Sequence, residues 1–341
     1  GIGHYFVPRY TRVVDTAESK DNINKAYNLI STSKVRNEMI IDDVITCVAR
    51  KQTPVILTRF KEHAKFLHDA LKEKADHVFL LYGDNSDKEN AEIRVKLKQI
   101  PENESLILVA TGQKIGEGFD FPRLDVLMLA APVSFEGRLE QYVGRLNRDY
   151  VGKEAVYVYD YIDSHVRYFD KMYAKRLRTY RKTGFSIWTQ ELQPKQIINA
   201  IFDSVNYTEK FEQDIVESEK MVVISSPDIK QDKIDRFLLL IKKRQEVGVK
   251  VTVITTDPED ITYGKSDVCY ELIRAMQLVG INVITRTEVE ECFAVIDDEI
   301  VWHGGMNLLG KADVWDNLMR IRNSQVATEL LEIALGCSEE R

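Results

Sequence analysis

Two arginines three residues apart, Arg145 and Arg148, have the clearest capacity for chemistry in this chain. On a helix, a spacing of three places both guanidinium groups on one face. Paired guanidinium groups suit the charge that spreads over a phosphoryl group during its transfer. An arginine pair by itself is more often a solvated face or a salt-bridge partner, so the interpretation depends on the residues that accompany it.

A glycine-rich stretch precedes the arginine pair at residues 108–120, which read LVATGQKIGEGFD. Its apolar start is typical of a buried strand, and its glycines let backbone N–H groups approach phosphates or a nucleic-acid strand closely. A glycine loop alone is a plain turn in most proteins. Its combination with residues 141–148, which read QYVGRLNR, favours a functional interpretation.

These two stretches resemble motifs V and VI of superfamily 2 helicases, at the spacing of that family, and residues 54–71 resemble motif IV. The sequence of residues 116–125 is similar to that of DEAD/DEAH-like bacterial helicases related to type III restriction subunits. The resemblance covers residues 1–182. It implies the second RecA-like domain of an ATP-dependent DNA helicase, a hydrolase whose two RecA-like domains close and open along a strand.

The resemblance also implies roles for single residues. Arg148 matches the arginine finger, and Arg145 matches its companion that senses the γ-phosphate, so both are expected to be catalytic. The positions expected beside the bound nucleotide are Gly116, Gly118, Asp120 and Gln141. Contacts to the nucleic-acid backbone are expected from Thr111 and Gly112.

Two motifs that ATP hydrolysis requires are missing from the sequence. A GxxxxGK[ST] loop cradles the phosphates, and an acidic pair holds magnesium. No glycine stands at the required distance before a GK[ST], and no DExH-like strand end occurs. Both motifs lie on the first RecA-like domain in this superfamily. We therefore expect a fragment that begins after that domain. The intact protein would bind ATP and Mg²⁺, and this chain alone would bind neither tightly and would not hydrolyse ATP.

Residues 164–182 are expected to form a basic helix with seven Lys or Arg residues against one acid, Asp170. Basic side chains that neutralise phosphates give salt-dependent affinity for nucleic acid. We expect Lys175 and Arg178 to contact DNA, and RNA fits the same chemistry. The alternative is a solvated face, or arginines that pair with acids elsewhere in the fold.

Short apolar runs alternate with helical patterns along both parts of the chain, which predicts an α/β fold. The expected strands of the first part are 53–58, 78–82, 106–110, 126–130 and 155–159, after an entry strand over 5–14. Those of the second part are 221–225, 249–255, 281–285, 292–296 and 299–303. The predicted organisation is a RecA-like parallel-sheet domain over 1–182, a connector over 183–204 and a second α/β domain over 205–341.

Residues 290–307 look like the phospholipase D signature, HxKx4Dx6GSxN. Asp297, Gly304 and Asn307 stand where that pattern requires them. Glu290 replaces the nucleophilic histidine, and Cys292 replaces the phosphate-binding lysine. A carboxylate and a thiol do not supply the imidazole nucleophile and the cation that this chemistry needs.

The second domain is therefore expected to be a phospholipase D-like accessory domain without catalysis, suited to partner docking or to a homodimer. One alternative is a helicase-linked nuclease in which His303 takes over as nucleophile. Another is a non-motor interaction module, in which the RecA-like part only holds partners.

Composition limits the remaining classes. The net charge of −7 speaks mildly against nucleic acid, but it divides into +4 up to Lys182 and −11 beyond it. The objection therefore applies to the second domain. The longest apolar runs are too short to span a bilayer, and no signal segment opens the chain, so we expect a cytoplasmic protein without membrane contact. The four cysteines form no CxxC pair, so no metal site is expected.

Overall fold

The computed structural model describes residues 2–112, 120–133, 136–188, 200–261, 265–287 and 289–336. The chain divides into two compact units, Gly1–Trp188 and Thr189–Arg341. Gly116 and Gly118, two of the positions expected beside the nucleotide, lie outside the described residues.

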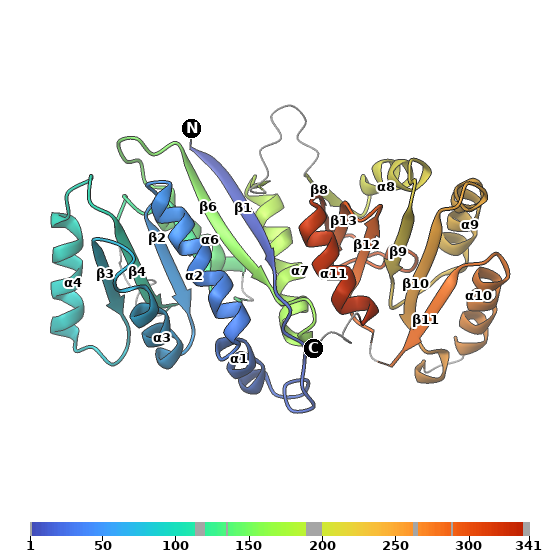
Figure 1. Ribbon diagram of the computed structural model, residues 1–341, viewed down its shortest axis with the longest axis horizontal. Coiled ribbons are helices and arrows are strands. Elements are labelled where there is room, and N and C mark those ends of the chain that lie inside the picture. Colours follow the sequence, from blue (N-terminus) through green and yellow to red (C-terminus); the bar gives the residue numbers. More distant parts are fainter. Residues whose placement is uncertain are drawn as a thin grey trace. The chain divides into compact units, whose positions relative to one another are not determined.

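The first unit is built on a parallel sheet, in which neighbouring described strands all run in the same direction. The strand order is β3-β4-β2-β5-β6-β1-β7, and Figure 1 shows β1 beside β6 although most of the unit separates them in sequence. The strands are β1 (Gly3–Tyr10), β2 (Pro54–Thr58), β3 (His77–Leu81), β4 (Leu106–Thr111), β5 (Val126–Leu129), β6 (Ala155–Ile162) and β7 (Ser186–Ile187). Helices cover both faces of such a sheet, which is why its central strands read as continuous apolar runs.

The described helices of the first unit are α1 (Ile23–Ser31), α2 (Lys34–Ala49), α3 (Lys61–Leu71), α4 (Asp87–Gln99), α6 (Glu136–Leu146) and α7 (Arg167–Lys182). Their starts follow local capping signals. Asn22 and Ser33 accept backbone N–H groups of the first turns of α1 and α2, and Ser86 forms a capping box with Glu89 at α4. The apolar faces of α2 and α3 pack onto the central strands in one buried cluster.

The second unit contains a mixed sheet with the strand order β11-β10-β9-β12-β13-β14-β8. Strands β9, β10 and β11 are parallel, and the others pair antiparallel. The strands are β8 (Ala200–Asp203), β9 (Met221–Ser225), β10 (Lys250–Thr256), β11 (Asn282–Arg286), β12 (Cys292–Ile296), β13 (Ile300–Gly304) and β14 (Asn317–Arg322). Asp297 and Asp298 form the β12–β13 turn with φ angles of +57° and +55°, as a type I′ hairpin turn requires.

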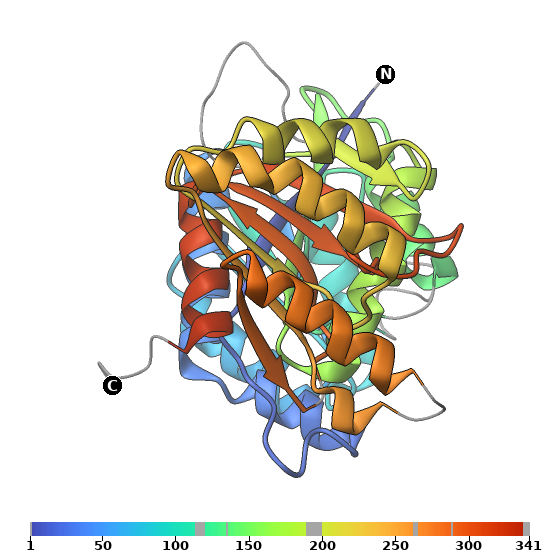
Figure 2. The same cartoon turned by 90° about the vertical axis from the view of Figure 1, so that its right-hand side faces the viewer.

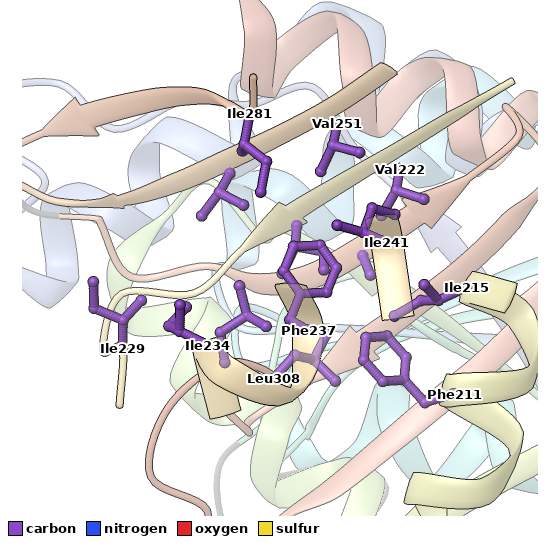
Figure 3. Close-up of a cluster of buried hydrophobic side chains, with 14 of the residues drawn as sticks. Phe211, Ile215, Val222, Ile229, Ile234, Phe237, Ile241, Val251, Ile281 and Leu308 are labelled. Atoms are coloured by element: carbon purple, nitrogen blue, oxygen red, sulfur yellow. The ribbon is translucent and has the colours of Figure 1, made fainter. Parts of the chain in front are cut away.

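Helices cover the second sheet. They are α8 (Tyr207–Val216), α9 (Gln231–Glu246), α10 (Ser266–Leu278) and α11 (Ser324–Leu335), with a short 3-10 turn, η1 (Pro258–Asp260). Figure 2 shows α8, α9 and α10, coloured from yellow to orange, lying across the strands. Figure 3 shows the apolar core beneath them, in which Phe211, Phe237 and Ile241 face Val222 and Val251.

The ends of the predicted connector belong to the two sheets. Strand β7 pairs with β1 through Tyr5 and Ser186, and strand β8 pairs with β14. Each short strand extends the sheet of its own unit by one strand. Of the residues between them, 189–199 lie outside the described residues.

The predicted α/β fold class is confirmed, with a parallel sheet in the first unit and a mixed sheet in the second. Of the helices that the structure describes, none is both long enough and apolar enough to cross a membrane.

Candidate functional site

A pocket of about 620 Å³ lies at the carboxyl ends of β2, β4 and β5 in the first unit. Parallel strands bring their carboxyl ends to one edge of the sheet, where ligands of open α/β sheets bind. The motif IV-like segment (residues 54–71) supplies Leu57 to Glu62, and the motif V-like segment (residues 108–120) supplies Thr111 and Gly112. Tyr142, from residues 141–148, lines the pocket as well, so the fold brings three of the segments singled out in the sequence to one site.

The pocket carries basic side chains beside its backbone groups. The Arg59 guanidinium lies 4.4 Å from the centre of the Tyr27 ring, and Lys61 Nζ lies 3.2 Å from Asp84 Oδ1. A Cβ atom at Gly112 would lie 2.6 Å from Tyr142 Oη, so any other residue there would require this α6 tyrosine to shift. Cations, hydroxyls and accessible backbone at one edge suit a phosphate backbone.

A buried histidine holds Thr58 at the pocket edge. Thr58 Oγ1 and His63 Nδ1 are 2.5 Å apart, and His63 Nε2 lies 2.7 Å from Asn37 Oδ1. The Asn37 amide nitrogen donates to Ser31 O, which fixes its Oδ1 as the acceptor for His63. Burial, together with the nearby Arg36 charge, lowers the pKa of His63 to about 3. His63 is therefore neutral, with Nε2 protonated, and it orients the threonine hydroxyl.

This histidine should make the first unit sensitive to acid. Between pH 6.5 and 3 the unfolded chain binds a proton at His63 that the folded chain excludes. The contribution of this histidine to the free energy of unfolding is therefore fully present above pH 6.5 and is lost as the pH falls below it. Below about pH 6 we expect the wild type to lose about 1.4 kcal/mol per pH unit more than His63→Gln. Pulse proteolysis in urea at pH 7, 6 and 5, read from cleavage within residues 1–188, measures the free energy of unfolding of the wild type and of His63→Gln. Parallel pH profiles would contradict the assignment.

The pocket wall at residues 130–133 is fixed from three helices. Tyr27 Oη donates to Pro132 O at 2.9 Å, Arg36 Nη1 to Ala130 O at 2.6 Å, and Arg176 Nη1 to Val133 O at 3.0 Å. Both arginines are also held by buried acids: Arg36 makes two bonds with Asp163, and Arg176 makes two with Asp160. Sequence reasoning missed these residues as supports of the site, because the bonds join segments up to 127 residues apart.

Arg176 corrects one expectation about the basic helix. The sequence counts it with the basic residues of 164–182, but its side chain is buried and paired with Asp160. Burial opposes the charged guanidinium, and the Asp160 carboxylate outweighs this, so the pKa of Arg176 is raised. Its charge therefore balances that of Asp160 inside the unit and does not contribute to the positive charge on the surface of the helix.

A row of exposed basic residues, the α7 stripe, remains on the opposite side of this helix. Its spacings of three and four residues place its members on one helix face. The α7 stripe consists of Arg167, Lys171, Lys175, Arg178 and Lys182. Lys182 also lies 3.6 Å from Glu140 of α6, an exposed ion pair.

The motif VI-like segment (residues 141–148) spans the end of α6. Arg145 is half-buried in the last turn, whereas Arg148 lies two residues beyond Leu146, where the helix ends. Sequence reasoning placed both on one helix face, but the structure puts only Arg145 on the helix. Arg148 Nε is 3.6 Å from Asp120 Oδ1, so the predicted arginine finger meets a predicted nucleotide-side residue. Gln141 is exposed on the same helix.

Part of the phospholipase D-like pattern comes together in the second unit. Cys292 pairs with Gly304 across β12 and β13, and Cys292 Sγ lies 3.9 Å from Asn307 Oδ1. Asn307 Oδ1 also accepts the backbone N–H of Asp228 at 3.0 Å, which ties two loops together. Glu290 is half-buried just before β12, and its carbonyl accepts from Cys292 Sγ at 3.8 Å.

Asp297 lies at the other end of β12 from Cys292. Its carboxylate accepts backbone N–H groups of Glu219, Lys220 and Met221 at 2.7 to 3.1 Å, and so fixes the start of β9. His303, the alternative nucleophile, is 0% exposed on β13 opposite Phe293. A Cβ at Gly304 would lie 2.1 Å from Asn317 O. These residues serve the packing of the unit.

Clusters of His, Cys, Asp or Glu that are able to hold a metal ion are absent from the part of the chain that the structure describes.

No family model matches the sequence. Among curated proteins, it is 30% identical over 138 residues to transcript termination protein A18 of Yaba-like disease virus, which covers 39% of this chain and 28% of that protein. It is 33% identical over 118 residues to "Putative helicase 161L" of Invertebrate iridescent virus 6, which covers 34% of this chain and 22% of that protein. The chain thus spans about a quarter of the length of these relatives.

Among solved structures, T4 UvsW matches with a TM-score of 0.45 and 22% identity over 55% of this chain and 41% of that one. Nuc of Salmonella typhimurium, a phospholipase D family member, matches with a TM-score of 0.33 and 15% identity over 39% of this chain and 89% of that one. The sequence similarities relate part of this chain to helicase-like proteins.

Proposed function

We propose that this chain supplies the second RecA-like half of an ATP-dependent superfamily 2 DNA helicase or translocase. One observation carries the proposal. Helix α6 places Tyr142 in the pocket beside Gly112, and its last turn and the residues beyond it bear Arg145 and Arg148. The helix and the residues that directly follow it therefore connect a surface suited to a phosphate backbone with two guanidinium groups suited to phosphoryl transfer.

In this proposal a separate RecA-like domain, with a P-loop and an acidic pair, binds ATP and Mg²⁺. Arg148 and Arg145 stabilise the charge on the γ-phosphoryl group as the two domains close. Asp120 and Gln141, with Gly116 and Gly118, lie beside the nucleotide. The Asp120 carboxylate holds Arg148 in place until the more highly charged phosphates compete for it.

The nucleic-acid strand would lie along the carboxyl edge of the sheet. Thr111 and Gly112 contact its backbone, and Arg59 and Lys61 add positive charge at the same pocket. Lys175 and Arg178 of the α7 stripe contact further phosphates. Positive charge at these places supplies affinity that does not depend on sequence, as a translocating motor requires.

The second unit would act as an accessory domain without phosphodiesterase chemistry. Asp297, Gly304 and Asn307 retain the family pattern but support backbone packing, and Glu290 and Cys292 replace the reactive pair. Docking of a partner or of a second copy of the chain is the role left to it.

The proposal is tested by measuring phosphate release from ATP with and without DNA. The chain alone is expected to release no phosphate above the blank, because its sequence lacks the P-loop and the acidic pair that hold ATP and Mg²⁺. The same chain in one polypeptide with its nucleotide-binding RecA-like domain, here called the assembled motor, is expected to show DNA-stimulated release. Strong DNA-stimulated turnover by the chain alone would overturn the proposed division of labour.

A further inference from the structure

Lys153 lies between the arginine-bearing segment and β6, and its ammonium group contacts the motif VI-like segment and the residues that follow the motif V-like segment. Its Nζ donates to Pro122 O at 3.0 Å, to Arg148 O at 2.9 Å and to Leu146 O. Pro122 stands two residues after Asp120, the last residue of the motif V-like segment. Leu146 ends α6, and Arg148 is the predicted arginine finger. One side chain therefore joins the backbone of three places on which the proposed function depends.

The chemistry of the ammonium group matches this arrangement. Lysine has three donors and no acceptor, and three carbonyls satisfy all of them. The last carbonyls of a helix lack partners within the helix, and a cation there interacts favourably with the helix dipole. Burial lowers the pKa of Lys153, with the Asp125 carboxylate acting in the opposite sense. The ammonium group is half-buried, and three carbonyl oxygens of the described residues accept its hydrogen bonds, so it serves geometry rather than surface charge.

The backbone around Lys153 is shaped to deliver it. Lys153 N donates to Tyr150 O at 3.0 Å, and Gly152 has a φ of +83°, which fits the third position of a type II turn. A further hydrogen bond holds the same loop, in which Tyr150 Oη donates to Glu102 Oε1 at 2.9 Å. The loop that carries Arg148 is thus held near its middle by Tyr150 and near its end by Lys153.

We propose that Lys153 is a positioning residue that holds the Arg148 backbone in register with the segment that follows Asp120. The arginine finger and its carboxylate neighbour then move as one body when the motor closes. This inference rests on the proposed function, and it adds a residue that the motif resemblance does not contain.

Lys153→Met in the assembled motor tests the inference. It keeps an unbranched side chain as far as the ε position and removes the ammonium group with all three donors. Because small misplacements of a reacting group cost up to about 10²-fold in rate, we expect kcat for ATP to fall about 10- to 100-fold, with KM changed less than about threefold. Lys153→Arg keeps the charge, but its planar fork does not reach three converging carbonyls, so an intermediate kcat is expected. The control is Lys96→Met, at an exposed position on α4.

Hydrogen exchange on the chain alone gives a second readout. Lys153→Met is expected to lose amide protection at residues 146–150 and 122–124, while β6 keeps its protection. If Lys153→Met matches Lys96→Met in kcat while Arg148→Ala is inactive, the inference is wrong and the proposed function stands. If Arg148→Ala is itself active, the proposed function fails. If β6 also loses protection, Lys153→Met disturbs more than the loop, and the kcat of Lys153→Arg is then the deciding measurement. A wild-type kcat in Lys153→Arg would overturn the inference.

Discussion

Arg148→Ala is expected to lower DNA-stimulated ATP hydrolysis by the assembled motor about 10³-fold or more, the usual contribution of an arginine finger. The guanidinium stabilises charge that develops only in the transition state, so kcat falls while the affinity for ATP changes little. Steady-state phosphate release at saturating DNA, with kcat and KM determined separately, measures the effect.

The fold should survive this substitution. Arg148 and Asp120 have side chains 58% and 54% exposed, and exposed ion pairs contribute little to stability. Arg148→Lys keeps the charge but loses the fork, so it should recover only a small part of the rate. Arg274→Ala, at an exposed position on α10 of the second unit, is the matched control and should leave kcat unchanged. Hydrolysis within a few-fold of wild type in Arg148→Ala would remove Arg148 from the catalytic role.

Arg176→Met is expected to destabilise the first unit by about 3 to 5 kcal/mol, because it leaves a buried carboxylate without its countercharge. Asp160 is 0% exposed and makes two bonds to Arg176, with Tyr180 Oη as a third donor at 2.6 Å. The substitution also frees Val133 O at the pocket wall. Pulse proteolysis in urea, read from cleavage within residues 1–188, gives the free energy of unfolding of this unit. Cleavage in the second unit serves as the internal reference.

The neighbouring Lys175 and Arg178 give the matched control. They are exposed, so Lys175→Gln with Arg178→Gln should leave the unfolding free energy unchanged within about 0.5 kcal/mol. The same pair is predicted to contact DNA. Losing two phosphate contacts should reduce the slope of log affinity against log salt by about two. Equal destabilisation by both variants would refute the buried role of Arg176. An unchanged slope of log affinity against log salt would show that Lys175 and Arg178 face solvent and do not contact DNA.

The sequence predicts much of the fold because local patterns encode local structure. Strands β9 (Met221–Ser225) and β12 (Cys292–Ile296) occupy the predicted ranges, and so does the turn at Asp297 and Asp298. Strand β14 was not predicted, since it places Arg320 within an apolar stretch. The partner that makes this possible, Asp214, lies 106 residues earlier in the chain.

The candidate site likewise contains residues that sequence motifs predict and residues that only the structure identifies. Motif resemblance alone selects Thr111, Gly112, Arg145 and Arg148, and their roles remain predictions. The sequence gives no sign that Lys153 reaches three carbonyls, or that Arg176 differs from Lys175 beside it. Spacing along a chain records which residues share a helix face, and this is a short-range property. Whether a charge faces water or a buried acid depends on which distant segments pack against it, and this only the tertiary structure decides.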